Sequence, residues 1–448
     1  MSYQFSDEHV ISPKFYGESG HPHEAFTWLR ANDPVHWTET QDFHPFWAIT
    51  KHEDIGFIER QPELFASEPR PILMPDRGSP EIRQEMMAQI FEKLRDAPKL
   101  MEVLAASDAR GLVRSLVQMD PPDHPKYRAL VQPWFTPTNL KGLEDRLHTI
   151  TREILDDMCG DGSTRELDFV QDVAVFPPLR LIAALLGIPR EDEWRILTLT
   201  NELFAGDDAE MKRVGDDPLS LIDTIKDIYA YFTEITDARR ANPTEDLASY
   251  IANGKIDDEY MPYRELVSYY TIVATAGHET TRTAMAGGLR ALLDNPEQMD
   301  LLRKGSTDIL KLAVEEMIRW STPVTQFCRT ATQDVSLRGK DIKAGDNLGL
   351  FYASANRDED VFDKPDAFRV DRQPNKHLAF GLGPHMCLGN ILARMELRIF
   401  FEQLIPRIDE MEINGDPDHL QASFVHGLKH LPIRYRLRLE FWYKYLSR

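Results

Sequence analysis

The segment from about residue 140 to 320 constrains the fold most, because its apolar residues recur with helical spacing over nearly its whole length. Strand patterns lie outside it: a hairpin over 35–50, strands over 328–354 with a turn at Gly345, and a strand pair near 422–438. We therefore expect a mainly α fold with a minor β region segregated from the helices. Within the segment, helices are predicted over 140–160, 178–187, 219–242, 263–295 and 308–320.

The chain carries no obvious internal boundary. Its 448 residues would allow two or three domains. However, no repeat, low-complexity tract or Gly/Ser linker divides it, so a single domain over 1–448 is predicted. The region 66–118 begins with several prolines and continues with a helical pattern, and we expect it to be loop-rich and mobile at its start.

Charge and terminal sequence exclude several classes of protein. The chain has 73 acidic and 52 basic residues, a net charge of −21, which argues against general nucleic-acid binding. The N-terminal stretch MSYQFSDEHVISPKF lacks the basic and apolar regions of a secretory signal. No uncharged apolar run is long enough to span a bilayer. We therefore expect a cytoplasmic protein without a membrane span.

The cysteines are few and widely spaced, which favours a reducing compartment over a disulfide framework or a zinc site: they are Cys159, Cys328 and Cys387. Cys387 stands in the glycine-rich stretch FGLGPHMCLG, just before a helical pattern. The N–H groups at a helix start stabilise a thiolate, the reactive and metal-binding form of cysteine. Gly381 and Gly383 allow a tight turn, and Gly389 leaves room for a large flat ligand. The alternative is a buried structural cysteine.

The pattern Phe380-Gly381-x-Gly383-x-His385-x-Cys387-x-Gly389 resembles the proximal haem-binding loop of the cytochromes P450, the haem-thiolate monooxygenases. The resemblance implies that family's fold, a triangular prism with haem b between the I and L helices. It implies that Cys387 is the axial ligand of the haem iron, where a thiolate favours O–O cleavage. His385 matches a position that hydrogen-bonds a haem propionate. Phe380, Gly381 and Gly389 belong to the same cofactor-binding loop.

A second motif, AGHETT at 276–281, lies inside the predicted helix 263–295. Glycine in mid-helix costs about 1 kcal/mol relative to alanine, and a broken local rule points to function. The alternative is a salt-bridged glutamate beside threonines bonded back to helix carbonyls. The segment resembles the family's oxygen-activating I-helix motif, where small residues such as Ala276 open a groove over the haem. By that resemblance Thr280 stabilises the activated oxygen species, Glu279 relays protons, and His278 packs without binding metal.

A third motif, EEMIRW, places Glu316 and Arg319 one helical turn apart, where they can pair. Most such pairs lie on a surface and contribute little to stability. Between the other two motifs, however, it resembles the family's E-x-x-R motif, which Arg372 completes. The resemblance implies a buried ion network that fixes the coil leading to Cys387.

Cationic groups for a haem are expected from separate parts of the chain. A haem carries two propionates, which need several cationic or hydrogen-bonding partners. His124 and Arg128 share one face of a predicted helix, and Arg329 follows the third motif. Each alone would be taken for a solvated charge, but the family resemblance implies that all three bind the propionates.

The resemblance extends over about 35–438 and implies insertion of one oxygen atom from O2 into a C–H bond of a lipophilic small molecule. The sequence has no flavin-binding or iron–sulfur cysteine pattern, so electrons are expected from a ferredoxin and its reductase. Arg394, Arg398 and the basic segment 429–448 are candidates for the docking face. We expect a monomer.

Substrate contacts are predicted by family position alone. Two mobile substrate-access regions are expected at about 66–118 and 188–240, and the basic-aromatic tail 439–448 is atypical of the family. The stretches AGHETTR and SFVHGLKHLPIRY resemble bacterial branches that oxidise terpenoids, steroid side chains and branched lipids. The residues expected to face substrate are mostly apolar, a pattern that an ordinary core also shows: Ile72, Leu73, Met74, Leu203, Phe204, Ile272, Thr275, Val324, Phe327, Phe424 and Val425.

Two other functions remain open at this point. A haem-binding sensor or carrier without turnover would not need the Glu279–Thr280 pair. A hydrolase with Cys387 as its nucleophile and a histidine as base would leave Arg128 and Arg329 without a role.

Overall fold

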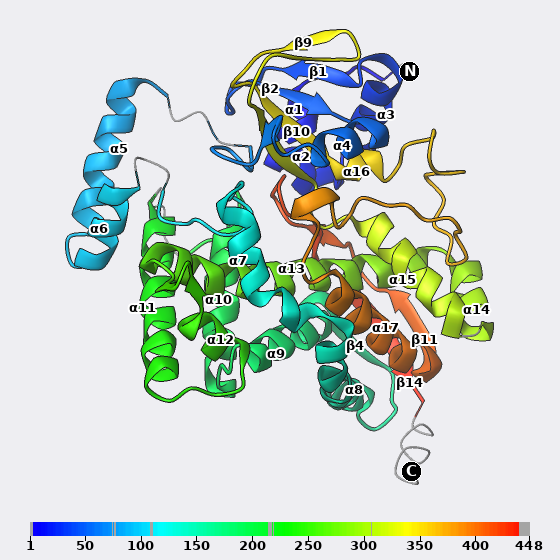
Figure 1. The fold of residues 1–448 in the computed structure, drawn as a ribbon. Coiled ribbons are helices and arrows are strands. Elements are labelled where there is room, and N and C mark those ends of the chain that lie inside the picture. Colours follow the sequence, from blue (N-terminus) through cyan, green and yellow to red (C-terminus); the bar gives the residue numbers. More distant parts are fainter. Residues whose placement is uncertain are drawn as a thin grey trace.

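The computed structural model describes residues 3–73, 75, 78–107, 111–213, 217, 219–305 and 307–438. Figure 1 shows a helical body with a β-rich region on one side of it, so the predicted fold class is confirmed. All five helices predicted between 140 and 320 are present. They are α8 (Pro137–Cys159), α9 (Phe176–Leu185), α11 (Ser220–Ala241), α13 (Tyr263–Asp294) and α15 (Thr307–Ser321).

Further helices complete the body. Proline stands in the first turn of α5, α6, α8 and α14. It fits there because the N–H groups of a first turn have no acceptor within the helix, so the N–H that proline lacks is not needed. The longer of these helices are α3 (His23–Asn32), α4 (His52–Glu59), α5 (Pro80–Lys93), α6 (Pro98–Ala106), α7 (Asp123–Val131), α10 (Glu193–Phe204), α14 (Pro296–Lys304) and α17 (Asn390–Arg407). The shorter elements are α1 (Glu8–Ile11), α2 (Pro13–Ser19), α12 (Leu247–Asn253), α16 (Tyr352–Ala355), η1 (Gln132–Phe135), η2 (Val170–Ala174), η3 (Arg190–Asp192) and η4 (Gly383–His385).

The main sheet has five strands in the order β1-β2-β10-β7-β3. Its strands are β1 (Val35–Thr38), β2 (Phe46–Ile49), β3 (Phe65–Ala66), β7 (Gln326–Ala331) and β10 (Asn347–Phe351). The predicted hairpin over 35–50 is confirmed as the antiparallel pair β1–β2. The turn predicted at Gly345 is also present, with a φ of 90° that favours glycine.

The remaining strands form smaller sheets, and one prediction about them is wrong. A three-stranded sheet joins β11 (Ile408–Ile413), β14 (Pro432–Leu437) and β4 (Arg165–Asp168), while β12 (Asp418–His419) pairs with β13 (Leu428–His430). The two strands near 422–438 therefore pair with other segments and not with each other. Their true partners are distant in sequence, which a local pattern does not reveal. Two hairpins complete the set: β5 (Lys255–Ile256) with β6 (Glu259–Tyr260), and β8 (Val335–Leu337) with β9 (Lys340–Ile342).

Helix α13 organises the body. It runs through the middle of the molecule and contacts α9, α10, α11, α12, α15 and α17 (Figure 1). Most of its residues are buried, as expected for a helix that is enclosed by others. Within the described ranges, none of the helices is both long enough and apolar enough to cross a bilayer.

Helices α5 and α6 lie at the margin of the molecule beside α11 (Figure 1). Most side chains of α5 are exposed, among them Ile82 and Phe91. Two ionic links tie this pair to α11: Lys93 pairs with Asp223, and Lys226 pairs with Asp96. This margin belongs to the region predicted to be loop-rich, and it is largely helical from residue 80 onward.

Candidate active site

Cys387 lies in a tight loop directly before α17. Gly381 and Gly383 adopt positive φ angles of 65° and 66°, which turn the chain back on itself. The Cys387 N–H thereby donates to the Phe380 carbonyl at 2.8 Å. The side-chain amide of Asn390 donates to the Cys387 carbonyl at 2.7 Å. As a residue Cys387 is partly exposed, whereas Cys159 and Cys328 are buried.

The loop is fixed from behind by Glu59, at the end of α4. The Glu59 carboxylate accepts hydrogen bonds from the Leu382 N–H at 2.8 Å and the Tyr352 hydroxyl at 2.7 Å. A Cβ at Gly383 would lie 2.2 Å from the Glu59 carbonyl oxygen, so only glycine fits there. Sequence reasoning missed Glu59, because its own helix gives no signal and its partners are far along the chain.

The pKa of the Cys387 thiol reflects opposing effects. Burial raises it, while the Gly389 N–H and the guanidinium groups of Arg128 and Arg394 act in the opposite direction. The stabilisation expected from the start of α17 is therefore present, but burial outweighs it in the protein alone. A coordinated metal cation deprotonates a thiol outright, so a thiolate at this position calls for a metal.

The predicted ion network around Glu316 is confirmed. Arg319 donates to both Glu316 oxygens at 2.7 and 2.8 Å, and Arg372 donates to both at 2.9 and 3.1 Å. The Arg369 N–H and the Asn375 side chain also donate to this carboxylate. Glu316, Arg319 and Arg372 are all buried. The network therefore ties α15 to the coil that leads to Cys387, as the resemblance implied, and a surface pair is excluded.

Four side chains predicted for the propionates lie close together. His124 and Arg128 come from α7, Arg329 from β7 and His385 from η4. The rings of His124 and His385 have centroids 4.1 Å apart. Burial, and after it the nearby Arg329 and Arg128, together lower the pKa of His385 to about 2. The cluster is thus an electropositive site in which both imidazoles stay neutral, and it is suited to an anionic group.

These cationic residues also contact the protein. Arg128 donates to the Met386 carbonyl at 2.8 Å, which joins α7 to the Cys387 loop. Arg329 donates to the Cys328 carbonyl at 2.8 Å and has Glu59 at 3.7 Å. His124 has a buried Nε2 without a hydrogen-bond partner among the described residues. An oxygen acceptor or donor at this point would satisfy that atom.

One face of α13 is open in mid-helix. Ala276 is exposed and Thr280 partly so, although most residues around them are buried. They stand one turn apart and share a face with Ile272. Gly277 does not contribute to this opening: a Cβ there would lie 2.5 Å from Ile182 of α9, so glycine allows close helix packing instead. The expected groove is therefore made by Ala276 and not by Gly277.

The motif residues Glu279 and Thr280 are both engaged within α13. The Thr280 hydroxyl donates to the Ala276 carbonyl at 2.7 Å, and buried Glu279 pairs with Arg282 at 2.5 Å. This geometry is the alternative weighed above, a salt-bridged glutamate beside a back-bonded threonine. His278 is buried, and burial lowers its pKa to about 3, in keeping with the packing role expected of it.

The residues expected to face substrate separate into groups. Phe327 and Phe424 meet edge to face at 5.3 Å, Phe204 lies 6.3 Å from Phe424, and Val324 bridges to Val425. These five residues form one apolar cluster from α10, the segment 324–327 that leads into β7, and the loop before β13.

Other members of that set lie elsewhere. Leu73 is buried in the core around Phe46 and Cys328, which accounts for its apolar character without a substrate. Thr275 lines a small apolar cavity between α10, α11 and α13 and donates to the Thr271 carbonyl. Ile72, Leu203 and Ile272 are partly buried, and Met74 lies outside the described residues.

The residues present fit a haem. A Cβ at Gly389 would find no atom within 4 Å, so the loop leaves free space next to the Cys387 thiol. The open face of Ala276 and Thr280 belongs to α13, which contacts α17. A thiol ligand, a flat open helix face and an electropositive cluster for two carboxylates are the features that a haem-thiolate protein requires.

Comparison with known proteins agrees with this class. The cytochrome P450 family profile matches residues 79–425. Cytochrome P450-terp of a Pseudomonas species is 36% identical over 95% of this chain and 96% of its own length. The methyl-branched lipid omega-hydroxylase of Mycobacterium tuberculosis is 33% identical over 91% of this chain and 90% of its own length. The crystal structure of CYP108D1 from Novosphingobium aromaticivorans is similar with a TM-score of 0.82 and 36% identity, covering 96% of this chain and 98% of that chain.

The chain belongs to the cytochrome P450 family. It is a haem b monooxygenase, which decides against the hydrolase and the haem sensor considered above.

Proposed function

We propose that this protein hydroxylates a lipophilic small molecule of the terpenoid, steroid or branched fatty-chain type. The observation that carries the proposal is the position of Cys387 at the start of α17, a helix that packs against α13, together with the exposed Ala276 in the middle of α13. Haem, when bound, supplies the activation of O2 and the insertion of one oxygen atom into a C–H bond. The residues of this chain hold the cofactor, shape the substrate site and deliver protons.

Each group near the cofactor has a role in this proposal. Cys387 is the iron ligand, while Arg128, Arg329, His124 and His385 hold the propionates. An anion between the two guanidinium groups favours the protonated forms of the nearby imidazoles, so their low pKa values rise on binding. The loop residues Phe380, Gly381 and Gly389 shape the proximal face.

The substrate class is inferred from the apolar cluster. Phe204, Phe327, Phe424 and Val324 are partly exposed despite being apolar, as expected for side chains that line a binding site. One similar enzyme is named for methyl-branched lipids, which fits such a lining.

The first test is a titration of the purified ferric enzyme with terpenoids, sterols, fatty acids and small aromatics. Displacement of water from the iron by a fitting ligand shifts the absorption from low to high spin. A tight shift with one lipophilic class identifies the substrate class. A red protein that responds only to polar compounds would overturn the proposed class while leaving the haem site intact.

The ligand assignment is tested separately. Cys387→Ala should abolish the thiolate-type absorption of the reduced CO complex, whereas Cys328→Ala, at a buried cysteine in the sheet, should retain it. A thiolate band in Cys387→Ala would exclude this cysteine as the ligand.

The proton pathway is proposed to pass through Glu279 and Thr280. The carboxylate is paired with Arg282, so it must exchange this partner for water before it can carry a proton toward Thr280. Thr280→Val should uncouple electron use from product formation and release peroxide, and the neighbouring buried Thr281→Val is the matched control. Equal coupling in both variants would count against the pathway.

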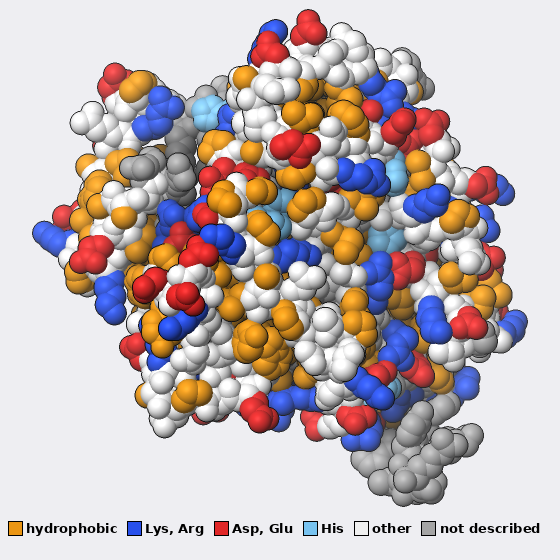
Figure 2. All heavy atoms as spheres, viewed as in Figure 1, with side chains coloured by type: hydrophobic (Ala, Val, Ile, Leu, Met, Phe, Trp, Pro, Cys, Tyr) orange, Lys and Arg blue, Asp and Glu red, His pale blue; other side chains and the backbone are white. Residues whose placement is uncertain are grey.

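Electrons are proposed to come from a ferredoxin and its reductase. Arg394 and Arg398 follow the Cys387 loop on α17, but both are ion-paired, Arg394 with Glu315 and Arg398 with Glu144 and Glu402. The face in Figure 2 accordingly shows Lys and Arg side chains with Asp and Glu between them. Arg398→Gln should slow reduction by ferredoxin and Glu144→Gln should speed it, because the first removes a cation and the second unmasks one. Unchanged rates in both would exclude this face.

A further inference from the structure

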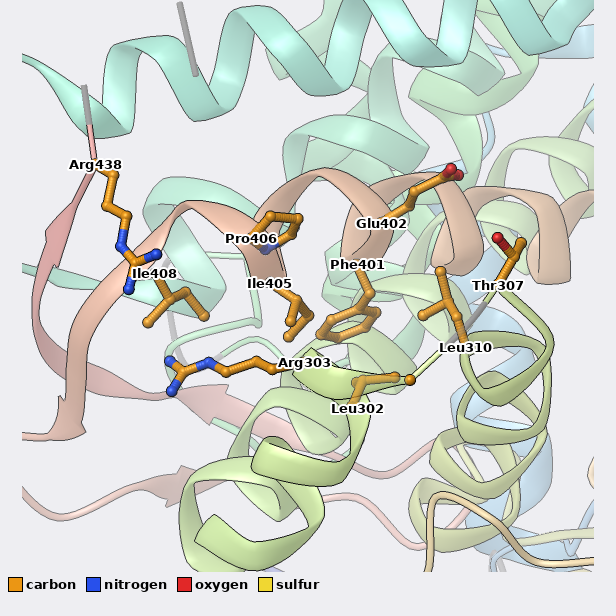
Figure 3. Close-up of a pocket in the computed structure, with 11 residues that line it drawn as sticks. Leu302, Arg303, Thr307, Leu310, Phe401, Glu402, Ile405, Pro406, Ile408 and Arg438 are labelled. Atoms are coloured by element: carbon orange, nitrogen blue, oxygen red, sulfur yellow. The ribbon is translucent and has the colours of Figure 1, made fainter. Parts of the chain in front are cut away.

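A groove lies at the end of α17 that is remote from Cys387. It has a volume of about 380 Å³, and Figure 3 shows it between α17, α14 and the start of α15. An apolar cavity of about 150 Å³ already holds a benzene ring, so this groove has room for two aromatic side chains. Its apolar lining comes from Leu302, Leu310, Phe401, Ile405, Pro406 and Ile408.

The chain itself leads into this groove. Arg438 is the last described residue, and its side chain lines the groove (Figure 3). It follows β14, whose partner β11 begins at Ile408 on the groove wall. Residues 439–448, with the sequence LEFWYKYLSR, continue from this point.

The length of that segment suits the groove. The wall from Ile408 to Phe401 follows α17 for about 10 Å, at 1.5 Å of rise per residue. An extended chain advances by about 3.3 to 3.6 Å per residue, so three to four residues beyond Arg438 can span about 10 to 14 Å. This reach matches the length of the apolar wall, and positions 441 and 442 carry phenylalanine and tryptophan.

The order of charges along the groove matches the order along the segment. Arg438 and Arg303 stand toward one end of the groove, and Glu402 stands toward the other (Figure 3). In the segment, Glu440 comes first and Lys444 follows. A segment that runs from Arg438 toward Glu402 therefore brings each charge near one of opposite sign.

We propose that residues 439–448 fold back onto this groove of their own chain, with Phe441 and Trp442 against its apolar floor and Lys444 beside Glu402. Seated there, the segment joins the end of α17 to the start of α15. These two helices carry the Cys387 loop and the Glu316 network at their other ends. The inference does not depend on the substrate class proposed above.

Hydrogen exchange of the haem-loaded full chain tests the proposal. Deletion of 439–448 should speed exchange of amides in 302–310 and 401–408 by about tenfold, since burial of one aromatic side chain shifts an equilibrium by that factor or more. Trp442→Ala should reproduce most of this change and Ser447→Ala should not. Unchanged exchange after the deletion would overturn the proposal.

A charge exchange tests the direction of the segment. Glu402→Lys should reduce protection of the groove, and Lys444→Glu added to it should restore protection. Glu410→Lys, at an exposed carboxylate of β11, is the matched control. Absence of rescue in the double variant would overturn the proposed direction. Protection that is lost on dilution, together with a dimer in light scattering, would show that the segment of a second copy occupies the groove and would overturn the intramolecular form.

Discussion

The loop of Cys387 and the helices α5 and α6 are attached to the same body in opposite ways. The loop is held by charges removed from solvent: Glu316 and Arg319 are at most 1% exposed, and Glu59 accepts hydrogen bonds from behind. Helices α5 and α6 bury only a few apolar side chains, such as Ile90 and Leu100, and are otherwise tied by partly exposed ion pairs, while Ile82 remains 53% exposed.

This difference separates fixed from adaptable parts of the enzyme. Removing one partner of a buried ion network leaves unpaired charges away from water and costs several kcal/mol, whereas a surface pair is worth about 0 to 1 kcal/mol. The Cys387 loop, as the iron-binding segment proposed above, would have to keep its position through every turnover. Weakly attached helices at the margin can move at little cost, and the mobile access region expected for 66–118 stays a prediction.

The largest effect is expected from breaking the buried network. Glu316→Gln leaves Arg319 and Arg372 without their anion, and we expect it to destabilise the protein by about 3 to 5 kcal/mol. Thermal unfolding of the haem-loaded protein measures this loss. Glu410→Gln, which removes an exposed partner of Arg436, should change stability by less than about 1 kcal/mol. Similar losses in both variants would erase the distinction between the two kinds of attachment.

A smaller effect is expected at the turn of the loop. Gly383→Ala introduces a side chain at a φ of 66° and places its Cβ 2.2 Å from the Glu59 carbonyl oxygen. Gly345→Ala is matched, because φ is 90° there but no atom lies within 4 Å. The left-handed backbone alone costs about 1 to 2 kcal/mol, so the control should lose that much and Gly383→Ala distinctly more. The measurements are denaturant unfolding and the retention of haem by the two variants. Equal losses of unfolding free energy would mean that the backbone of the loop shifts to relieve the clash at residue 383.

A third kind of attachment uses neutral buried imidazoles. His21, His419 and His426 cluster between α2, α13 and the β12–β13 hairpin, and burial lowers the pKa of His21 and of His419 from 6.5 to about 4. At a pH between about 4 and 6.5, each of these histidines is protonated in the unfolded chain and neutral in the folded chain. Stability should therefore fall as pH falls from 6.5 to 4, by about 1.4 kcal/mol per pH unit for each such group.

The measurement is the unfolding free energy as a function of pH for the protein and for His419→Gln. Because glutamine does not titrate, the variant should show a shallower acid loss over this range. An unchanged slope would mean that His419 takes up a proton in the folded state.

The smallest effect is expected at the margin. Lys93→Met removes the pairs with Asp217 and Asp223 and should lower the unfolding free energy by less than about 1 kcal/mol. Hydrogen exchange in 80–106 should nevertheless rise, and about 1 M salt should have the same effect on the unaltered protein. Arg95→Met, which breaks a local pair with Glu92 at the end of α5 and no link to α11, should leave exchange unchanged. A large loss of global stability would contradict the prediction and show that these ion pairs support the helical core.

Strong local patterns predicted much of the fold, and distant partners explain what was missed. The long helices, such as α13, repeat their apolar residues over many turns, so their positions follow from the sequence. Strands β4 and β11 are defined by pairing with β14 across the chain, and no local signal marks them. Family position supplied the site residues, whereas Glu59 and Glu315 act on partners that only the folded chain brings near.

The motif of Glu279 and Thr280 is a second case in which the sequence did not reveal the contacts of the side chains. The sequence placed a carboxylate next to a hydroxyl, yet consecutive helical residues point in different directions. Glu279 pairs with Arg282 and Thr280 donates to the Ala276 carbonyl, and both partners lie on the same helix. Their adjacency in sequence therefore does not by itself define a relay.

The hydrogen bond from Leu382 to Glu59 also sets an order of assembly. Its two ends are separated by 323 positions in the chain. During synthesis the N-terminal part emerges first and must wait for the last quarter of the polypeptide before the cysteine turn can close. Closure of the cysteine turn is consequently a late event in the maturation of this enzyme, and a ribosome-bound chain that stops short of residue 382 carries Glu59 without the backbone N–H that this carboxylate binds.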